Sequence, residues 1–262
     1  MKSCLLAVAV FCLGGVLSAD ETPNAAVEVL ANDAKAPPVL TTETPAPEVL
    51  RICRAMLPAR PVELKGSLIL RSRKGIVARE YDYRLALRRG ADVSLLAIHL
   101  MPRGETNEIA SVTVTRRPGV RPAIRLARAG AAEAEIVDSP LARVLETDVT
   151  WLDLTFDFLW WPNAAYEADR EGESIHGQTC VVILVKPDVA IEGLSAVRLW
   201  VDKKTGCLMQ AEQVDASGKP LRRLWGTRVK KMDGRWMVSV LEVETLGSRH
   251  RTKITVDALR DL

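Results

Sequence analysis

The sequence has few of the residues that carry catalysis or hold a chain in a membrane. It contains three histidines and five cysteines in 262 residues, and its formal net charge is only +3. This near balance of charge argues against a nucleic-acid partner, because proteins that bind nucleic acids carry a strongly basic face. Beyond the first 19 residues, no apolar run approaches the roughly 18 residues of a membrane-spanning helix.

Motifs of the common enzyme and metal sites are also missing. The sequence has no HExxH, CxxC or Walker loop. His99, His176 and His250 are far apart and do not have the spacing of metal ligands. Residues 193–197 (GLSAV) lack the second glycine of a nucleophile elbow. We therefore predict no catalytic residues, no metal site and no cofactor, and a protein that is not an enzyme.

The first 19 residues have the pattern of a secretory signal peptide. A lysine at position 2 precedes an apolar stretch over residues 5–13, and small residues follow up to position 19. The apolar stretch is too short to anchor the chain in a bilayer. Cys12 follows Phe11, whereas acylated cysteines follow a small residue, so no lipid anchor is expected. The pattern predicts export to the periplasm without an anchor.

The next part of the chain is predicted to be a spacer. Residues 20–50 contain five prolines, and six acidic residues against one lysine. A segment of this composition buries too little apolar surface to offset its ordering entropy. We predict a disordered spacer over residues 20–44 that is rich in proline, alanine and acidic residues. The remaining residues, 45–262, are enough for a single domain.

Three cysteines remain after removal of the signal: Cys53, Cys180 and Cys207. If residues 186–193 and 203–206 are hairpin turns, Cys180 and Cys207 lie on strands that are not adjacent. That separation exceeds the reach of a disulfide. We favour buried free thiols, although an oxidising compartment would permit one disulfide.

The hydrophobic pattern predicts one helix followed by many strands. Residues 45–57 have helical spacing, with Thr44 as a possible cap. From residue 62 onward the period changes to two, and turn signals recur at short intervals. About eleven strands are predicted, over residues 63–73, 76–88, 92–101, 109–116, 120–127, 179–186, 195–202, 207–215, 220–232, 235–245 and 249–257. Short strands with regular turns are typical of an antiparallel meander.

An aromatic segment over residues 147–162 interrupts this meander and holds three of the six tryptophans and two of the three phenylalanines. We expect a helix that leads into an extended or irregular stretch, where apolar residues from 152 to 160 alternate with Asp153, Thr155 and Asp157. The two aspartates are expected to be exposed strand carboxylates rather than a catalytic pair. Aromatic side chains bury the most apolar area, so the segment is either core or the wall of an apolar cavity.

Five motifs together resemble one known family. They are residues 150–162 (TWLDLTFDFLWWP), 177–182 (GQTCVV), 197–206 (VRLWVDKKTG), 215–221 (DASGKPL) and 233–236 (DGRW). In this combination the chain resembles the LolA-like outer-membrane lipoprotein-sorting family, in a largely uncharacterised subgroup. The likeness extends over residues 140–257, and residues 45–130 share only the strand pattern.

The resemblance implies a mainly β fold: a half-open antiparallel barrel of about eleven strands with a short N-terminal helix and a helical, aromatic lid. It further implies a periplasmic carrier that shelters lipid or the acyl chains of lipoproteins, with envelope membrane proteins as possible partners. The cavity and lid residues would be Trp151, Leu152, Leu154, Phe156, Phe158, Trp160 and Trp161. The alternative is a cargo-free binding or scaffold module of the envelope with the same fold. No arginine is assigned to the latch that closes the lid in characterised carriers.

Overall fold

The computed structural model describes residues 39–57, 60–72, 74–89, 94–117, 120–232 and 235–262. The predicted signal peptide, and the predicted spacer as far as residue 38, lie outside the described residues. The chain forms two compact units, and the single domain over residues 45–262 stays a prediction. Unit one takes the described residues of Met1–Pro58 and Phe158–Leu241, and unit two those of Ala59–Asp157 and Glu242–Leu262.

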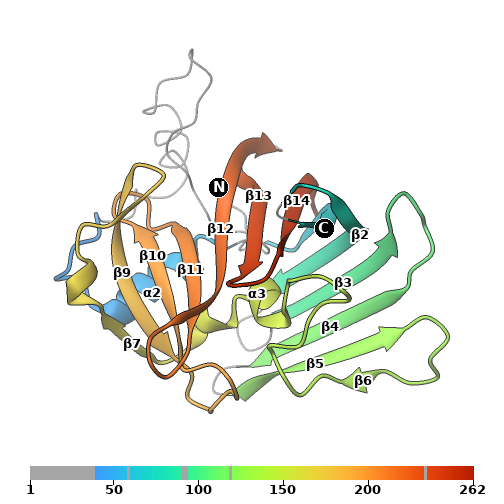
Figure 1. Ribbon diagram of the computed structural model, residues 1–262, viewed down its shortest axis with the longest axis horizontal. Coiled ribbons are helices and arrows are strands. Elements are labelled where there is room, and N and C mark those ends of the chain that lie inside the picture. Colours follow the sequence, from blue (N-terminus) through green and yellow to red (C-terminus); the bar gives the residue numbers. More distant parts are fainter. Residues whose placement is uncertain (1–38, 58–59, 73, 90–93, 118–119, 233–234) are drawn as a thin grey trace. The chain divides into compact units, whose positions relative to one another are not determined.

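Unit two is a wide antiparallel sheet in which most neighbours along the chain are also neighbours in space. Its strand order is β6-β5-β4-β3-β2-β1-β14, and Figure 1 shows β2 to β6 of this series in teal to green. The bounds are β1 (Val62–Ser72), β2 (Val77–Arg89), β3 (Ser94–Pro102), β4 (Ala110–Arg117), β5 (Val120–Arg128), β6 (Glu135–Ile136) and β14 (His250–Asp261). This order is the meander that the sequence predicted.

Unit one combines the N-terminal helix with the second group of strands, in the order β12-β11-β10-β9-β7, with β8 paired to β9. Helix α2 (Ala46–Ala55) packs beside β7. The strands are β7 (Asn163–Tyr166), β8 (Ser174–Ile175), β9 (Gln178–Lys186), β10 (Ala196–Asp202), β11 (Leu208–Val214) and β12 (Pro220–Met232). The following strand, β13 (Arg235–Thr245), begins in unit one and ends in unit two.

The predicted fold class is confirmed: the chain is mainly antiparallel β with few helices. The strand order ends at β6 in unit two and at β7 in unit one, so the sheet is open. All eleven predicted strands are present, and the described residues contain three more, β6, β7 and β8, with two to four residues each. Strands this short show too few alternations to be detected from a hydrophobic pattern.

The end of the predicted spacer is part of unit one. Leu40 is fully buried, and its backbone N–H donates to the carbonyl of Lys203 at 2.7 Å. The hydroxyl of Tyr166 also donates to the carbonyl of Thr41 at 2.9 Å. Thr44 does not cap α2, because the N-cap is Pro45 and makes no side-chain cap hydrogen bond. Residues that precede the helix are therefore packed on unit one.

The three remaining cysteines are buried and free, as the sequence analysis favoured. Cys180 lies on β9, and Cys207 directly precedes Leu208, the first residue of β11. Strand β10 lies between β9 and β11, so the two cysteines are not on adjacent strands. The thiol of Cys53 donates to the carbonyl of Gly206 at 3.4 Å. Burial raises the pKa of Cys180 to about 12, so this thiol stays protonated at neutral pH. A protonated thiol is a poor nucleophile.

Candidate functional site

The sheet of unit two has one strongly apolar face. Leu64, Leu85, Ile98, Val112 and Leu126 form a cross-strand row from β1 to β5, each paired with the next. None of these side chains is more than 6% exposed. Side chains on a strand alternate between faces, so this row defines the inward face of the sheet.

Residues 139–157, here called the cover segment, pack on the inward face and are fastened to it at several points. The backbone N–H of Asp148 donates to the hydroxyl of Thr252 on β14 at 2.8 Å. Arg79 of β2 forms an ion pair with Glu146 at 2.8 Å. The N–H of Val144 donates to the carbonyl of Val149 at 2.8 Å, which closes a tight loop within the segment.

The aromatic part of the cover segment contains a short helix and a 3-10 turn where an extended or irregular stretch was expected. Helix α3 (Trp151–Thr155) starts with a capping box, in which the Thr150 hydroxyl accepts from the N–H of Asp153 and the Asp153 carboxylate accepts from the N–H of Thr150. A capping box satisfies two free amides and favours a helical turn locally. Phe156 ends the helix in the left-handed region, at φ 51°. A single 3-10 turn (Asp157–Trp160) follows.

Both aspartates that were expected to be exposed have structural partners. Asp153 is only 3% exposed and caps α3. Asp157 pairs with Arg116 of β4 at 2.8 Å, and the Arg116 guanidinium also donates to the carbonyl of Thr155 at 3.2 Å. This arginine holds the C-terminal end of the cover segment. The sequence contained a signal for it, since Arg116 continues the inward alternation of Val112 and Val114.

A cavity of about 410 Å³ lies between the sheet and the cover segment, at the end of the sheet opposite to Arg116. Its lining residues all belong to unit two. The apolar wall consists of Leu100, Leu126, Leu145 and Trp151, together with the ring of Tyr81. Leu145 has a φ of 52°, which is rare for a leucine and strained. Backbone strain of this kind often occurs at binding sites.

The rim of the cavity is charged. Arg128, Arg143 and Glu146 complete its lining, and the first two come from the end of β5 and from the cover segment. Burial and the nearby Glu146 carboxylate raise the pKa of Tyr81, although Arg79 acts in the opposite direction. The Tyr81 hydroxyl is therefore protonated at neutral pH and available as a donor.

The seven predicted cavity and lid residues do not form one group. Trp151 lines the cavity. Leu152, Leu154 and Phe156 are at most 3% exposed and lie in unit two. The others belong to unit one, where Phe158 and Trp161 are buried in an edge-to-face ring contact at 6.5 Å and Trp160 is half-buried. The sequence did not predict the cavity residues of the sheet, such as Leu100 and Leu126. Strand alternation shows which residues share a face of the sheet, but not which of them line a cavity.

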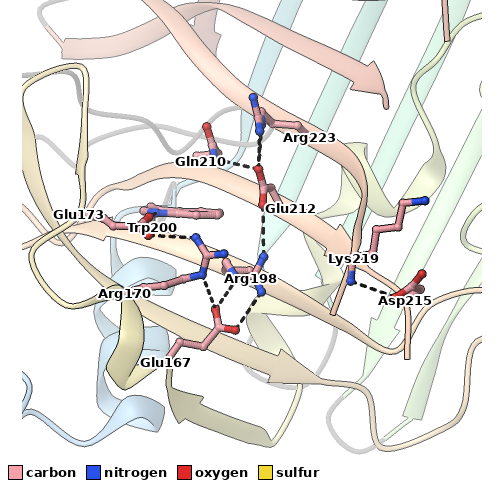
Figure 2. A network of polar contacts seen from close by, with 10 residues as sticks. All are labelled: Glu167, Arg170, Glu173, Arg198, Trp200, Gln210, Glu212, Asp215, Lys219 and Arg223. Carbon is pink, nitrogen blue, oxygen red and sulfur yellow. Dashed lines mark hydrogen bonds and ion pairs between the residues drawn. The ribbon is translucent and has the colours of Figure 1, made fainter. Parts of the chain in front are cut away.

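Unit one contains a cluster of charged side chains. Figure 2 shows this cluster together with the nearby Asp215–Lys219 turn. Arg198 on β10 pairs with Glu167, at 2.9 Å through Nη2, and donates to Glu212 at 3.4 Å. Arg223 of β12 donates to the same Glu212 at 2.8 Å, and Trp200 donates to Glu173 at 2.7 Å. With Arg170, which pairs with Glu173, the cluster has three arginines and three glutamates. Its charges cancel, so it holds strands together and leaves no charge for a ligand.

In the described part of the chain, the His, Cys, Asp and Glu side chains form no group placed to hold a metal ion. No helix there is long and apolar enough to cross a membrane.

Comparisons with known proteins support the fold. One protein family, described as an uncharacterized protein, matches residues 138–260. Among curated proteins there is no match.

Three solved structures are similar over most of their length. A putative outer membrane lipoprotein-sorting protein domain from Vibrio parahaemolyticus has a TM-score of 0.71 and 15% identity, over 84% of this chain and 93% of that one. A DUF1329 family protein from Desulfovibrio piger has a TM-score of 0.69 and 16% identity, over 82% and 91%. A LolA superfamily protein from Nitrosomonas europaea has a TM-score of 0.63 and 16% identity, over 83% and 94%. The resemblance to LolA-like proteins is thus confirmed at the level of the fold.

Proposed function

We propose that the protein is an exported carrier that shelters lipid or the acyl chains of lipoproteins in the cavity of unit two. The observation that supports this proposal is a cavity, lined in part by Leu126, Leu145 and Trp151, beneath a cover segment that is fastened at identifiable points. Each methylene moved from water into such a site contributes about 0.8 kcal/mol. The cover segment acts as the lid, and its release opens more of the inward face to cargo.

The proposed compartment and substrate class have independent support. The first 19 residues have the pattern of a secretory signal. The Vibrio parahaemolyticus structure of similar fold is named as a lipoprotein-sorting domain. A non-enzymatic carrier in the periplasm accounts for both, and it explains a sequence without a catalytic motif.

One observation favours a second candidate, a cargo-free binding or scaffold module of the cell envelope. The inward face is largely filled by the chain's own side chains, since Trp151, Leu152 and Phe156 are at most 2% exposed. In a carrier these residues leave the face when cargo enters. In a scaffold they stay, and uptake of an apolar probe separates the two functions.

Filling the cavity should block uptake of apolar ligands. In Leu126→Trp, the larger ring extends from the inward face of β5 into the 410 Å³ cavity. We expect phenylnaphthylamine, a neutral fluorophore, to bind the unmodified protein and to bind the variant at least about tenfold more weakly, which is about 1.4 kcal/mol. Fluorescence titration measures both affinities.

The matched control is Ala123→Trp, which adds the same ring to the exposed, outward face of the same strand. It should bind the fluorophore as well as the unmodified protein does. An unmodified protein that takes up no fluorophore, or equal uptake by Leu126→Trp, would contradict the carrier function and favour the scaffold.

Loss of the Arg116 contacts should release the cover segment. The side chains of Arg116 and Asp157 are 13% and 16% exposed, so their ion pair is largely shielded from water. Arg116→Gln should reduce the free energy of unfolding by about 1.5–3 kcal/mol, the range for hydrogen bonds to charged groups. Hydrogen exchange of the amides of residues 151–157 should become faster, and so should uptake of the fluorophore.

Arg117→Gln is the control, because Arg117 is the exposed next residue of β4. If Arg116→Gln lowered stability but left both the exchange and the uptake rate unchanged, Arg116 would stabilise the fold without controlling a lid.

A further inference from the structure

The cavity of unit two is lined by apolar and by charged side chains in comparable measure. Trp151 and Leu100 are at most 2% exposed and form part of the inner wall. The side chains of Arg128 and Glu146, by contrast, are 56% and 69% exposed. A ligand that matches this division has an apolar chain and a polar end.

The charge of the rim favours an anion at that polar end. Arg128 pairs with Glu135 at 3.2 Å, and Glu146 pairs with Arg79 at 2.8 Å. Arg143 is exposed, and within the described residues its side chain forms no ion pair. Three arginines against two glutamates leave the rim and its immediate partners with a net charge of +1.

The two lining arginines come from different elements. Arg128 lies on the inward face of β5, two residues after Leu126 and directly across from Ala110. Arg143 lies on the cover segment. A β-bridge joins its backbone to Thr150, the residue before Trp151. A guanidinium presents several N–H donors in one plane and matches the oxygens of a carboxylate or phosphate.

We propose that the cavity takes a single acyl chain with an anionic headgroup, whose oxygens are bound by Arg143 and Arg128 at the rim. This inference rests on the proposed carrier function and specifies the chemical class of its ligand. The chain lies against Leu126, Leu145 and the ring of Tyr81. The headgroup is a carboxylate or a phosphate, because both present the same anionic oxygens.

The test is displacement of bound phenylnaphthylamine from the full chain by dodecanoate, dodecyl phosphate and methyl dodecanoate, each below its micelle concentration. The two anions should bind at least about tenfold more tightly than the ester, which has the same chain and no charge. The tighter of the two anions identifies the headgroup. Raising the ionic strength should reduce the preference, because exposed charges are screened.

The variant Arg128→Gln/Arg143→Gln should lose the preference for anions and keep its affinity for the ester. Arg125→Gln is the matched control, since Arg125 is exposed on the outward face of the same strand. Equal affinity of ester and anions in the unmodified protein would overturn this inference and leave the carrier function intact. A preference that survived in the double variant would overturn the assignment to these arginines. No displacement by any of the three compounds, together with no fluorophore uptake, would overturn the carrier function itself.

Discussion

Replacing Gly66 by alanine is expected to destabilise unit two by about 3 kcal/mol or more, the upper end of what overpacking usually costs. A Cβ at this position would lie 1.8 Å from the carbonyl oxygen of Thr255 and 2.8 Å from the hydroxyl of Tyr83. The oxygen belongs to the backbone of β14, so β1 and β14 have to separate. Gly66 lies at a bulge, where Lys65 pairs with Ala258 and Gly66 with Val256. A glycine in a strand often marks such a close backbone approach.

Separating the strands would also break the hydrogen bond from the Tyr83 hydroxyl to the Thr255 carbonyl, which measures 2.8 Å. Urea denaturation followed by tryptophan fluorescence and by far-ultraviolet circular dichroism measures the loss. Gly104→Ala is the control, because a Cβ there meets nothing within 4 Å and only the positive φ of 75° opposes it. That change should cost about 1–2 kcal/mol.

A second variant identifies the atom responsible. Gly66→Ala combined with Tyr83→Phe should remain as unstable as Gly66→Ala alone, since the backbone carbonyl is still in place. Recovery in the double variant would mean that the hydroxyl, and not the strand backbone, limits the space.

Replacing Arg198 by methionine is expected to destabilise unit one by about 3–5 kcal/mol. Arg198 and Glu212 are 5% and 4% exposed, and the guanidinium bridges Glu212 and Glu167 (Figure 2). Without it, the Glu212 carboxylate stays buried with less compensation. Burying a charge without its partner costs far more than an intact pair contributes. Urea denaturation measures the change in the free energy of unfolding.

Arg223→Met tests whether burial decides the size of this effect. Arg223 binds the same Glu212, but its side chain is 39% exposed, so its loss should cost about 1 kcal/mol or less. Removing the stranded charge as well, in Arg198→Met/Glu212→Leu, should restore part of the lost stability. A cost below about 1 kcal/mol for Arg198→Met would show that the pair contributes little and that water reaches Glu212.

The strands could be predicted because their pattern is local. The eleven strands with seven or more residues show enough alternation to reveal both their period and their turns. Strand β7, with four residues, does not. The aromatic segment was misinterpreted for a related reason: its period of two resembles a strand, whereas the capping box of Thr150 and Asp153 favours a helical turn. A polar residue at a cap and a polar residue on an exposed strand face look alike in sequence.

The candidate site was predicted only in part. Trp151, one of the seven predicted cavity and lid residues, belongs to the lining of the 410 Å³ cavity, and its part in ligand binding stays a prediction. Leu100, Leu126 and Arg128 are far from it in sequence, and their part in the cavity depends on the pairing of β3, β4 and β5. Arg116 lies about 40 residues before its partner Asp157, so nothing in the local pattern joins them.

The sequence by itself determined the fold class, because alternation and turn residues act over a few positions, and it determined the lack of catalytic motifs. The tertiary structure alone decided which apolar residues are core and which line a cavity. It also decided that Leu40 packs on unit one and that Arg198 is buried between two glutamates. The physical reason is that cavities, buried ion pairs and close approaches such as Gly66 to Thr255 depend on residues brought together by strand register, and register is a property of the whole sheet.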